Sequence, residues 1–278
     1  MKSVVIWGAG ETGKRIYESI KDSVHVRFFV DMNEQIWGTE YKHIKIYSPE
    51  VLRTDCDFDY LIQGAQMADN IMQYMKEYGV PEWKLERSFV AVRLEARNLF
   101  LKQFAQTVVH LSGAVAEAGV YRGEFAKVIN RIFPERKCYL FDTFEGFDQR
   151  DFAYEKKSCE MLKAGRFNTT AVELVMKKMQ TPDMVKVYQG YFPETITEDV
   201  KKEKFVFVNL DMDLYKPTLD GLEFFWPRMI EGGILLVHDY FSQSYPNVKD
   251  AVDTFVESQS SRIYKMPIGD DLSIALIK

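Results

Sequence analysis

The stretch AVAEAGVYRGEFAKVINRIFPERKCYLFDTFEGF, residues 114–147, determines how the larger part of this chain is expected to fold. It predicts a strand, a glycine turn, a helix and a second strand. Glu117 ends the first strand, and Gly119 and Gly123 allow the backbone to turn sharply and to approach a ligand. Asp142 ends the second strand, 23 residues after Gly119, about the interval at which a carboxylate meets the two hydroxyls of a ribose. The stretch predicts a nucleotide-like ligand, and the spacing alone does not identify it.

Length and composition indicate a two-domain globular protein. The chain has 278 residues, of which 46% are hydrophobic and 28% charged, enough apolar material for ordinary cores and no bias toward disorder. Thirty-six basic and 41 acidic residues give a net charge of −5, without a basic run. Nucleic acids and anionic membranes reward a concentrated basic surface, so neither is expected as a partner.

The location of the protein is expected to be cytoplasmic. The sequence starts directly with a predicted strand, and no apolar run approaches membrane-spanning length. Cys56, Cys138 and Cys159 show neither the CxxC spacing of metal or redox sites nor an even count, so we interpret them as reduced thiols.

A second glycine turn follows the first predicted strand, KSVVIW. The turn GAGETG, residues 8–13, is a complete GxGxxG pattern, and Asp31 lies 23 residues after Gly8. Two interpretations stay open: a dinucleotide or nucleotide-sugar site, or glycines that only pack a helix against a strand. The segments GAGETG, FFVD, YSPEVL and YGVPEWKL resemble the Rossmann-like modules attached to polysaccharide-biosynthesis enzymes, and this resemblance implies a sugar context. We expect an accessory domain over residues 1–90 and a second domain over residues 91–278.

Two further strand ends in the second domain carry acidic and imidazole groups. FVFVNLDMDLYKPT, residues 205–218, places Asp211 after an apolar strand with Asp213 two residues on, and alternation puts both carboxylates on one side of an extended backbone. GGILLVHDY, residues 232–240, ends in His238 and Asp239. Ligands of open α/β sheets bind at the carboxyl ends of the strands, and these groups suffice for a divalent ion. A single aspartate at a strand end more often caps a helix, but two such pairs on neighbouring strands favour a site.

The second domain resembles the macrocin O-methyltransferase (TylF-type) family of S-adenosylmethionine-dependent sugar methyltransferases. The resemblance covers residues 95–278 in the right order. Its matching segments are EAGVYRGEFA, YLFDTFEGF, FNTTAVELV, YQGYFPET, LDMDLYKPTLDGLEFFWPRMIEGGILLVHDY and AVDTF. It implies an α/β protein with two Rossmann-like domains, the C-terminal one a doubly wound sheet of the class I methyltransferase type.

The resemblance also implies roles for individual residues. Asp211 is similar to a metal ligand and general base of the family, and Asp239 to a second ligand. The family usually has an acid where this chain has His238; Mg²⁺ prefers oxygen ligands, so the identity of the metal and the need for it stay open. Without a metal, Asp211 or His238 would act as the base alone. The residues implied to bind S-adenosylmethionine are Glu117, Gly119, Tyr121, Gly123, Asp142, Thr143 and Phe144.

The function implied is transfer of a methyl group to the hydroxyl of a sugar, in a glycan, a nucleotide sugar or a glycosylated metabolite. The alternatives are a non-catalytic module that binds a nucleotide sugar, and an NAD-dependent sugar oxidoreductase or epimerase that uses the glycines between Gly8 and Gly13. The charged segment of residues 148–170 suits a lid over the site or a pair of solvated helices. We expect a homodimer, although no sequence feature requires one.

Overall fold

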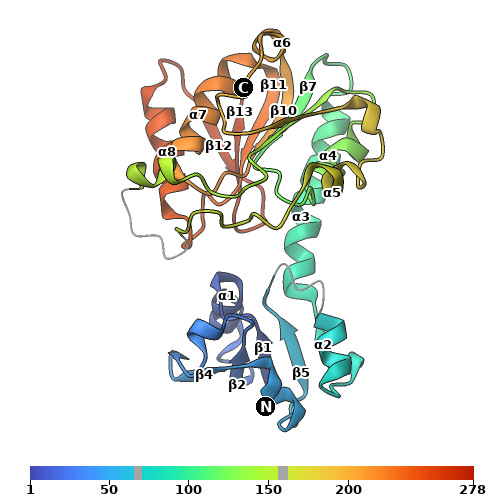
Figure 1. The fold of residues 1–278 in the computed structure, drawn as a ribbon, viewed down its shortest axis with the longest axis vertical. Coiled ribbons are helices and arrows are strands. Elements are labelled where there is room, and N and C mark those ends of the chain that lie inside the picture. The colour runs from blue at the N-terminus through green and yellow to red at the C-terminus, as the bar shows by residue number, and fades with distance from the viewer. Residues whose placement is uncertain (66–70, 156–161) are drawn as a thin grey trace. The chain divides into compact units, whose positions relative to one another are not determined.

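The computed structural model describes residues 1–65, 71–155 and 162–278 (Figure 1). The chain divides into two compact units, Met1–Glu95 and Ala96–Lys278, and the division falls within helix α3 (Ser88–Thr107). Cys159 and part of the expected lid lie outside the described residues. In the part of the chain that the structure describes, no helix is both long enough and apolar enough to cross a membrane.

The first unit contains a six-stranded sheet in the order β3-β4-β2-β1-β5-β6, parallel except for the β3–β4 pair. Ile16 of helix α1 packs with one set of strand residues, and Ile71 and Met75 of helix α2 pack with the alternate set. The sheet is therefore covered on both faces, as the apolar strands predict. The elements are β1 (Ser3–Trp7), α1 (Glu11–Ile20), β2 (His25–Val30), β3 (Glu40–Tyr41), β4 (Ile44–Tyr47), β5 (Tyr60–Gln63), α2 (Ile71–Glu77) and β6 (Leu85–Glu86).

The second unit contains a seven-stranded sheet in the order β12-β13-β11-β10-β7-β8-β9. Strands β9, β8, β7, β10 and β11 are parallel, and β13 lies antiparallel between β11 and β12. The strands are β7 (Ala114–Ala118), β8 (Cys138–Asp142), β9 (Val185–Gln189), β10 (Phe205–Leu210), β11 (Met229–Val237), β12 (Tyr264–Pro267) and β13 (Ile274–Ile277). The helices are α4 (Ala126–Ile132), α5 (Val172–Met176), α6 (Glu198–Lys202), α7 (Tyr215–Phe225) and α8 (Pro246–Ser258).

Helices cover both faces of this sheet, and strand β8 shows how (Figure 1). Its Tyr139 and Phe141 belong to the core that includes residues of α7 and α8, whereas Cys138 and Leu140 belong to the core that includes residues of α3, α4 and α5. Alternate side chains of one strand thus enter two separate cores, because successive residues of a strand point to opposite faces. This is the doubly wound arrangement expected from residues 114–147.

The strand order reverses between β7 and β10. From β7 the chain proceeds outward to β8 and β9, and from β10 it proceeds in the opposite direction to β11. In open α/β sheets the crevice at such a switch point, beyond the carboxyl ends of the strands, is where ligands bind. Residues that follow β7 and β10 are therefore the first place to look for a site.

Candidate functional site

Glu117 lies in β7 at the switch point and is almost fully buried, with 2% of its surface exposed. Its Oε1 accepts a hydrogen bond of 2.9 Å from Nδ2 of Asn209, the residue opposite it on β10. Its Oε2 is buried and has no hydrogen-bond partner among the residues that the structure describes. Burial, together with the negative charge of Asp211, raises the pKa of Glu117 well above its usual value. A buried carboxyl with one oxygen unsatisfied is a receptor for a cationic or hydrogen-donating group.

The glycines of the turn after β7 are required by packing within the chain. Gly119 has a φ of +83°, and a Cβ there would lie 1.9 Å from the carbonyl oxygen of Asp211. Gly123 has a φ of +74°, and a Cβ there would lie 2.9 Å from a methyl group of Val175. The expected sharp turn is present, and it brings β7 and the end of β10 into direct backbone contact.

Asp142 holds the conformation of this turn. Its Oδ2 accepts hydrogen bonds from the backbone N–H groups of Val120 (2.7 Å) and Tyr121 (2.8 Å), and its Oδ1 accepts one from that of Phe144 (2.7 Å). A carboxylate offers about four acceptor positions, so about one remains for a ribose hydroxyl. The structure therefore assigns Asp142 a backbone-holding role in addition to the ribose contact implied by the resemblance.

Three other residues implied to bind the cofactor lie around the same turn, and each has contacts within the chain. The hydroxyl of Tyr121 lies 2.8 Å from Oγ1 of Thr169. Thr143 donates through Oγ1 to the carbonyl of Gly146 over 2.8 Å, closing the turn after β8. Phe144 is 6% exposed and packs in the core beneath α4. Thr143 and Phe144 thus shape the loop, and their direct contact with a ligand stays a prediction.

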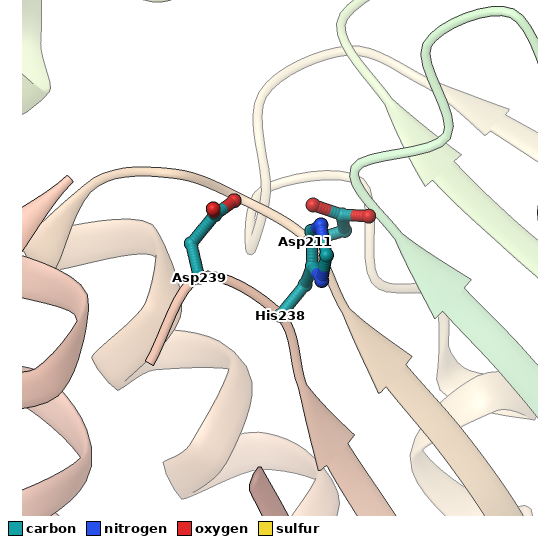
Figure 2. Close-up of side chains that lie close together, drawn as sticks. All are labelled: Asp211, His238 and Asp239. Carbon is teal, nitrogen blue, oxygen red and sulfur yellow. The ribbon is translucent and has the colours of Figure 1, made fainter. Parts of the chain in front are cut away.

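Asp211, His238 and Asp239 come together at the carboxyl ends of β10 and β11. Each offers one ligand atom, and the three atoms lie within 4.8 Å of one another. Figure 2 shows the three side chains reaching into the space beyond the two neighbouring strands. The parallel pairing of β10 with β11 produces this convergence, since Leu210 lies opposite Val237 and the next residues emerge side by side. Two carboxylates and an imidazole are a suitable donor set for a divalent cation.

Asp213 also belongs to this group of acids, but for a different reason from the one expected. Strand β10 ends at Leu210, and Asp213 has a φ of +61°, so alternation along an extended strand does not place it. Burial and the nearby carboxylates of Asp239 and Asp211, the first through a hydrogen bond, raise the pKa of Asp213 well above its usual value. Acids crowded in this way attract a cation, because a positive ion relieves their repulsion.

Arg97 of helix α3 connects the two parts of the site, and no sequence pattern predicts this contact. Its Nη2 donates to Oδ1 of Asn209 over 2.9 Å and lies 3.4 Å from Oδ2 of Asp211. Its guanidinium also stacks 3.8 Å from the centre of the Phe125 ring. Asn209 could have been identified from the sequence as a site residue, because it is a polar residue in an otherwise apolar strand, two positions before Asp211. Arg97 could not, because it is one of several charged residues on a helix distant in sequence.

In the glycine turn of the first unit, an aspartate likewise accepts hydrogen bonds from backbone N–H groups. Asp31 accepts the backbone N–H of Ala9 through Oδ2 (2.7 Å) and that of Asn33 through Oδ1 (2.8 Å). A Cβ on Gly13 would lie 1.8 Å from the carbonyl oxygen of Gly8. These contacts agree with the interpretation in which the glycines pack a helix against a strand, and a nucleotide in this unit stays a prediction.

The second unit matches a known family. The model of macrocin-O-methyltransferase (TylF) matches residues 91–268, and that of the N-terminal domain of C2185-like proteins matches residues 1–86. A relative from Streptomyces olivaceus, 8-demethyl-8-(2,3-dimethoxy-alpha-L-rhamnosyl)-tetracenomycin-C 4'-O-methyltransferase, is 27% identical over 46% of this chain and 53% of its own length. Demethyldecarbamoylnovobiocin O-methyltransferase from Streptomyces niveus is 26% identical over 56% of this chain and 63% of its own length. The chain thus spans between about half and two thirds of these relatives.

Solved structures share the fold. The O-methyltransferase NovP superposes with a TM-score of 0.57 at 24% identity, covering 66% of this chain and 79% of its own. The calicheamicin methyltransferase CalS11 gives a TM-score of 0.55 at 17% identity, covering 82% and 89%. The predicted class I methyltransferase type of α/β fold is confirmed, and so is the resemblance on which it depended. Because the family model matches more than half of its residues, this chain belongs to the macrocin-O-methyltransferase (TylF) family.

Proposed function

We propose that this protein is an S-adenosylmethionine-dependent O-methyltransferase that acts on a sugar hydroxyl of a glycosylated small molecule or glycan, with a divalent cation at Asp211, His238 and Asp239. One observation carries the proposal: the buried, half-satisfied carboxyl of Glu117 and the cluster around Asp211 occupy adjacent strands at the switch point. This arrangement would place a methyl donor next to an acceptor hydroxyl that the cation polarises. The names of the relatives, which include a methyltransferase of a rhamnosyl compound, support a sugar as acceptor.

The residues present fit the methyl donor. The unsatisfied Oε2 of Glu117 is an acceptor for a cationic amino group, and the donor carries one on its methionine part. Asp142 keeps about one acceptor position for a ribose hydroxyl. When bound, the donor supplies a methyl carbon made electrophilic by the sulfonium. Glu117, Gly119 and Asp142 would hold the donor beside the end of β10, where the cluster lies.

The residues present also fit a divalent cation, through the two carboxylates and the imidazole of the cluster. A cation there would lower the pKa of a sugar hydroxyl and fix its direction.

The reaction is an in-line displacement in which the hydroxyl oxygen forms a bond to the methyl carbon as the carbon–sulfur bond breaks. Asp211 takes the hydroxyl proton, and adenosylhomocysteine leaves with the bonding electron pair. Arg97 holds the carboxylate of Asp211 in place. Alignment of the two reactants supplies up to about 7 to 11 kcal/mol of the barrier reduction.

The test is a transfer assay with radiolabelled S-adenosylmethionine against a panel of glycosylated metabolites, nucleotide sugars and glycans, with and without added divalent cation. We expect transfer to at least one sugar acceptor, and a loss of about 10² to 10⁴ in rate for Asp211→Asn, as for removal of a general base. The matched control is Asp183→Asn, which changes an exposed carboxylate before β9 and leaves the rate unchanged. Full activity in Asp211→Asn contradicts the assigned base, and calorimetry without S-adenosylmethionine binding contradicts the proposed function.

A further inference from the structure

We propose that Ser273 and Asp270 are positioning residues that fix the tautomer of His238, so that its Nε2 keeps a lone pair for a divalent cation at the cluster. The inference rests on the proposed function, because the cation serves methyl transfer there.

The antiparallel strand β13 brings Ser273 to His238. Val237 of β11 lies opposite Ile274 of β13, and one further step of the same register places the next residue, His238, opposite Ser273. Nδ1 of His238 lies 3.0 Å from Oγ of Ser273. This contact belongs to the pairing of the sheet and does not depend on a loop that adapts to the imidazole.

The hydrogen bonds beyond Ser273 determine which group donates. Oγ of Ser273 donates to Oδ2 of Asp270 over 2.6 Å. A serine hydroxyl has one proton, so in its contact with His238 the serine oxygen must accept. In the neutral imidazole of His238, Nδ1 therefore carries the proton and Nε2 has the lone pair.

Asp270 is fixed and buried, so it holds Ser273 in one orientation. It is 3% exposed, and its Oδ1 accepts the backbone N–H groups of Leu272 (3.1 Å) and Ser273 (2.7 Å). With these bonds the carboxylate has one oxygen for the backbone and one for the serine hydroxyl. The hydrogen bonds thus run in a single direction, with His238 donating to Ser273 and Ser273 donating to Asp270.

This arrangement is the one that metal-binding histidines require. A histidine that binds a metal through one nitrogen donates its other N–H to a carboxylate, a carbonyl or water, which orients the ring and fixes the tautomer. Here the hydroxyl of Ser273 accepts the N–H of His238 and in turn donates to the carboxylate of Asp270. An imidazole nitrogen is a softer ligand than a carboxylate oxygen, so the cluster should favour Mn²⁺ over Mg²⁺ more strongly than an all-carboxylate site does.

The first measurement needs neither metal nor substrate. Full-length, metal-free protein labelled with ¹⁵N-histidine is examined by NMR, and the signals of His238 are assigned by comparison with His238→Gln among the four histidines of the chain. We expect Nδ1 protonated and Nε2 unprotonated in the wild type and in Ser273→Thr, which retains the hydroxyl. Ser273→Ala should show a mixture of tautomers. A neutral His238 in the wild type with its proton on Nε2 overturns the inference.

The second measurement is Mn²⁺ binding, followed by electron paramagnetic resonance, with Mg²⁺ as competitor. Ser273→Ala and Asp270→Asn should weaken Mn²⁺ binding by about 10- to 100-fold, as expected for loss of a group that orients a metal ligand. Ser273→Thr, which keeps the hydroxyl, should bind Mn²⁺ like the wild type. Thr181→Ala, which removes a hydroxyl bonded to the Asn130 side chain elsewhere in this unit, is the control and should bind Mn²⁺ like the wild type.

Unchanged Mn²⁺ affinity in Ser273→Ala, or no Mn²⁺ binding by the wild type, overturns the inference. If Ser273→Ala does not fold, the wild-type spectrum and the Asp270→Asn titration decide. Calorimetry with S-adenosylmethionine on the wild type separates the two proposals: a protein that binds Mn²⁺ as described but no methyl donor refutes the proposed function and leaves the histidine assignment intact.

Discussion

Asn209 and Glu117 face each other on neighbouring strands, and the amide of Asn209 donates to one carboxyl oxygen of Glu117 over 2.9 Å. The other oxygen has no partner in the described part of the chain. The pair therefore forms a buried polar contact that is complete on one side only. Such a contact costs stability in the free protein and gains a partner when a ligand binds.

Glu117 should make the stability of the second unit fall as pH rises. Its pKa is raised in the folded protein by burial and by Asp211, so the folded state binds a proton more tightly than the unfolded state. This stabilisation is complete below the pKa that Glu117 has in the unfolded chain. It is lost as pH rises toward the pKa that Glu117 has in the folded protein. Urea denaturation from weakly acidic to neutral pH should show Glu117→Gln gaining stability relative to the wild type as pH increases. Glu145→Gln, at an exposed carboxylate, should show a constant difference, and a constant difference for Glu117→Gln as well would refute the argument.

Asp142→Asn should loosen the glycine turn. The substitution removes one charged acceptor oxygen, and a hydrogen bond to a charged group contributes about 1.5 to 3 kcal/mol, so the amides of Val120 and Tyr121 should exchange about 10- to 100-fold faster. Hydrogen exchange followed by mass spectrometry measures this, and calorimetry should show weaker S-adenosylmethionine binding. Asp31→Asn is the matched control, because it removes the equivalent acceptor for Ala9 in the first unit. Asp31→Asn should change hydrogen exchange in the first unit alone. Weaker S-adenosylmethionine binding in this variant would indicate that the methyl donor binds in the first unit.

Gly119→Ala should destabilise the second unit by about 3 kcal/mol or more. The new Cβ would lie 1.9 Å from the Asp211 carbonyl oxygen, at a φ of +83° that disfavours any side chain. Gly269→Ala is the comparison in the same unit, since its φ is +87° and a Cβ there meets no described atom within 4 Å. Hydrogen exchange of the β7 and β10 amides in increasing urea reports on the second unit. Equal stability of the two variants would mean that the backbones of β7 and β10 are farther apart than described.

Arg97→Lys should lower the methyl-transfer rate about tenfold or more and leave S-adenosylmethionine binding nearly unchanged. A lysine ammonium is a single point charge and does not reproduce the planar group that contacts Asn209, Asp211 and the Phe125 ring together. Steady-state kinetics beside calorimetry separates the two effects. Lys102→Arg, at an exposed position of the same helix, is the control. An equal loss of donor affinity in Arg97→Lys would indicate that Arg97 supports the donor rather than Asp211.

Much of the second unit could be predicted from sequence, because its order follows from local signals. Apolar strands ending in Glu117, Asp142, Asp211 and His238 imply a parallel sheet, and parallel strands place their carboxyl ends at one edge. The three residues of the proposed cation site were identified on that basis, and the structure brings them together.

What escaped prediction depends on contacts between distant parts of the chain. Arg97 reaches the site from a helix more than a hundred residues before Asp211. Ser273 meets His238 only through the register of an antiparallel strand, which a short apolar segment does not reveal. Asp213 was expected near Asp211 from alternation, yet a left-handed backbone places it.

The two aspartates that hold glycine turns, Asp31 and Asp142, have a consequence for how sequence fingerprints are interpreted. In both units the acid 23 residues after the first glycine accepts a backbone N–H of the turn, so folding alone constrains glycine and acid together. A duplicated module that loses its nucleotide would keep its entire fingerprint, since each substitution would cost stability before it affected binding. The spacing of glycine and acid therefore reflects how the module folds. Its retention during evolution does not show that a nucleotide is still bound.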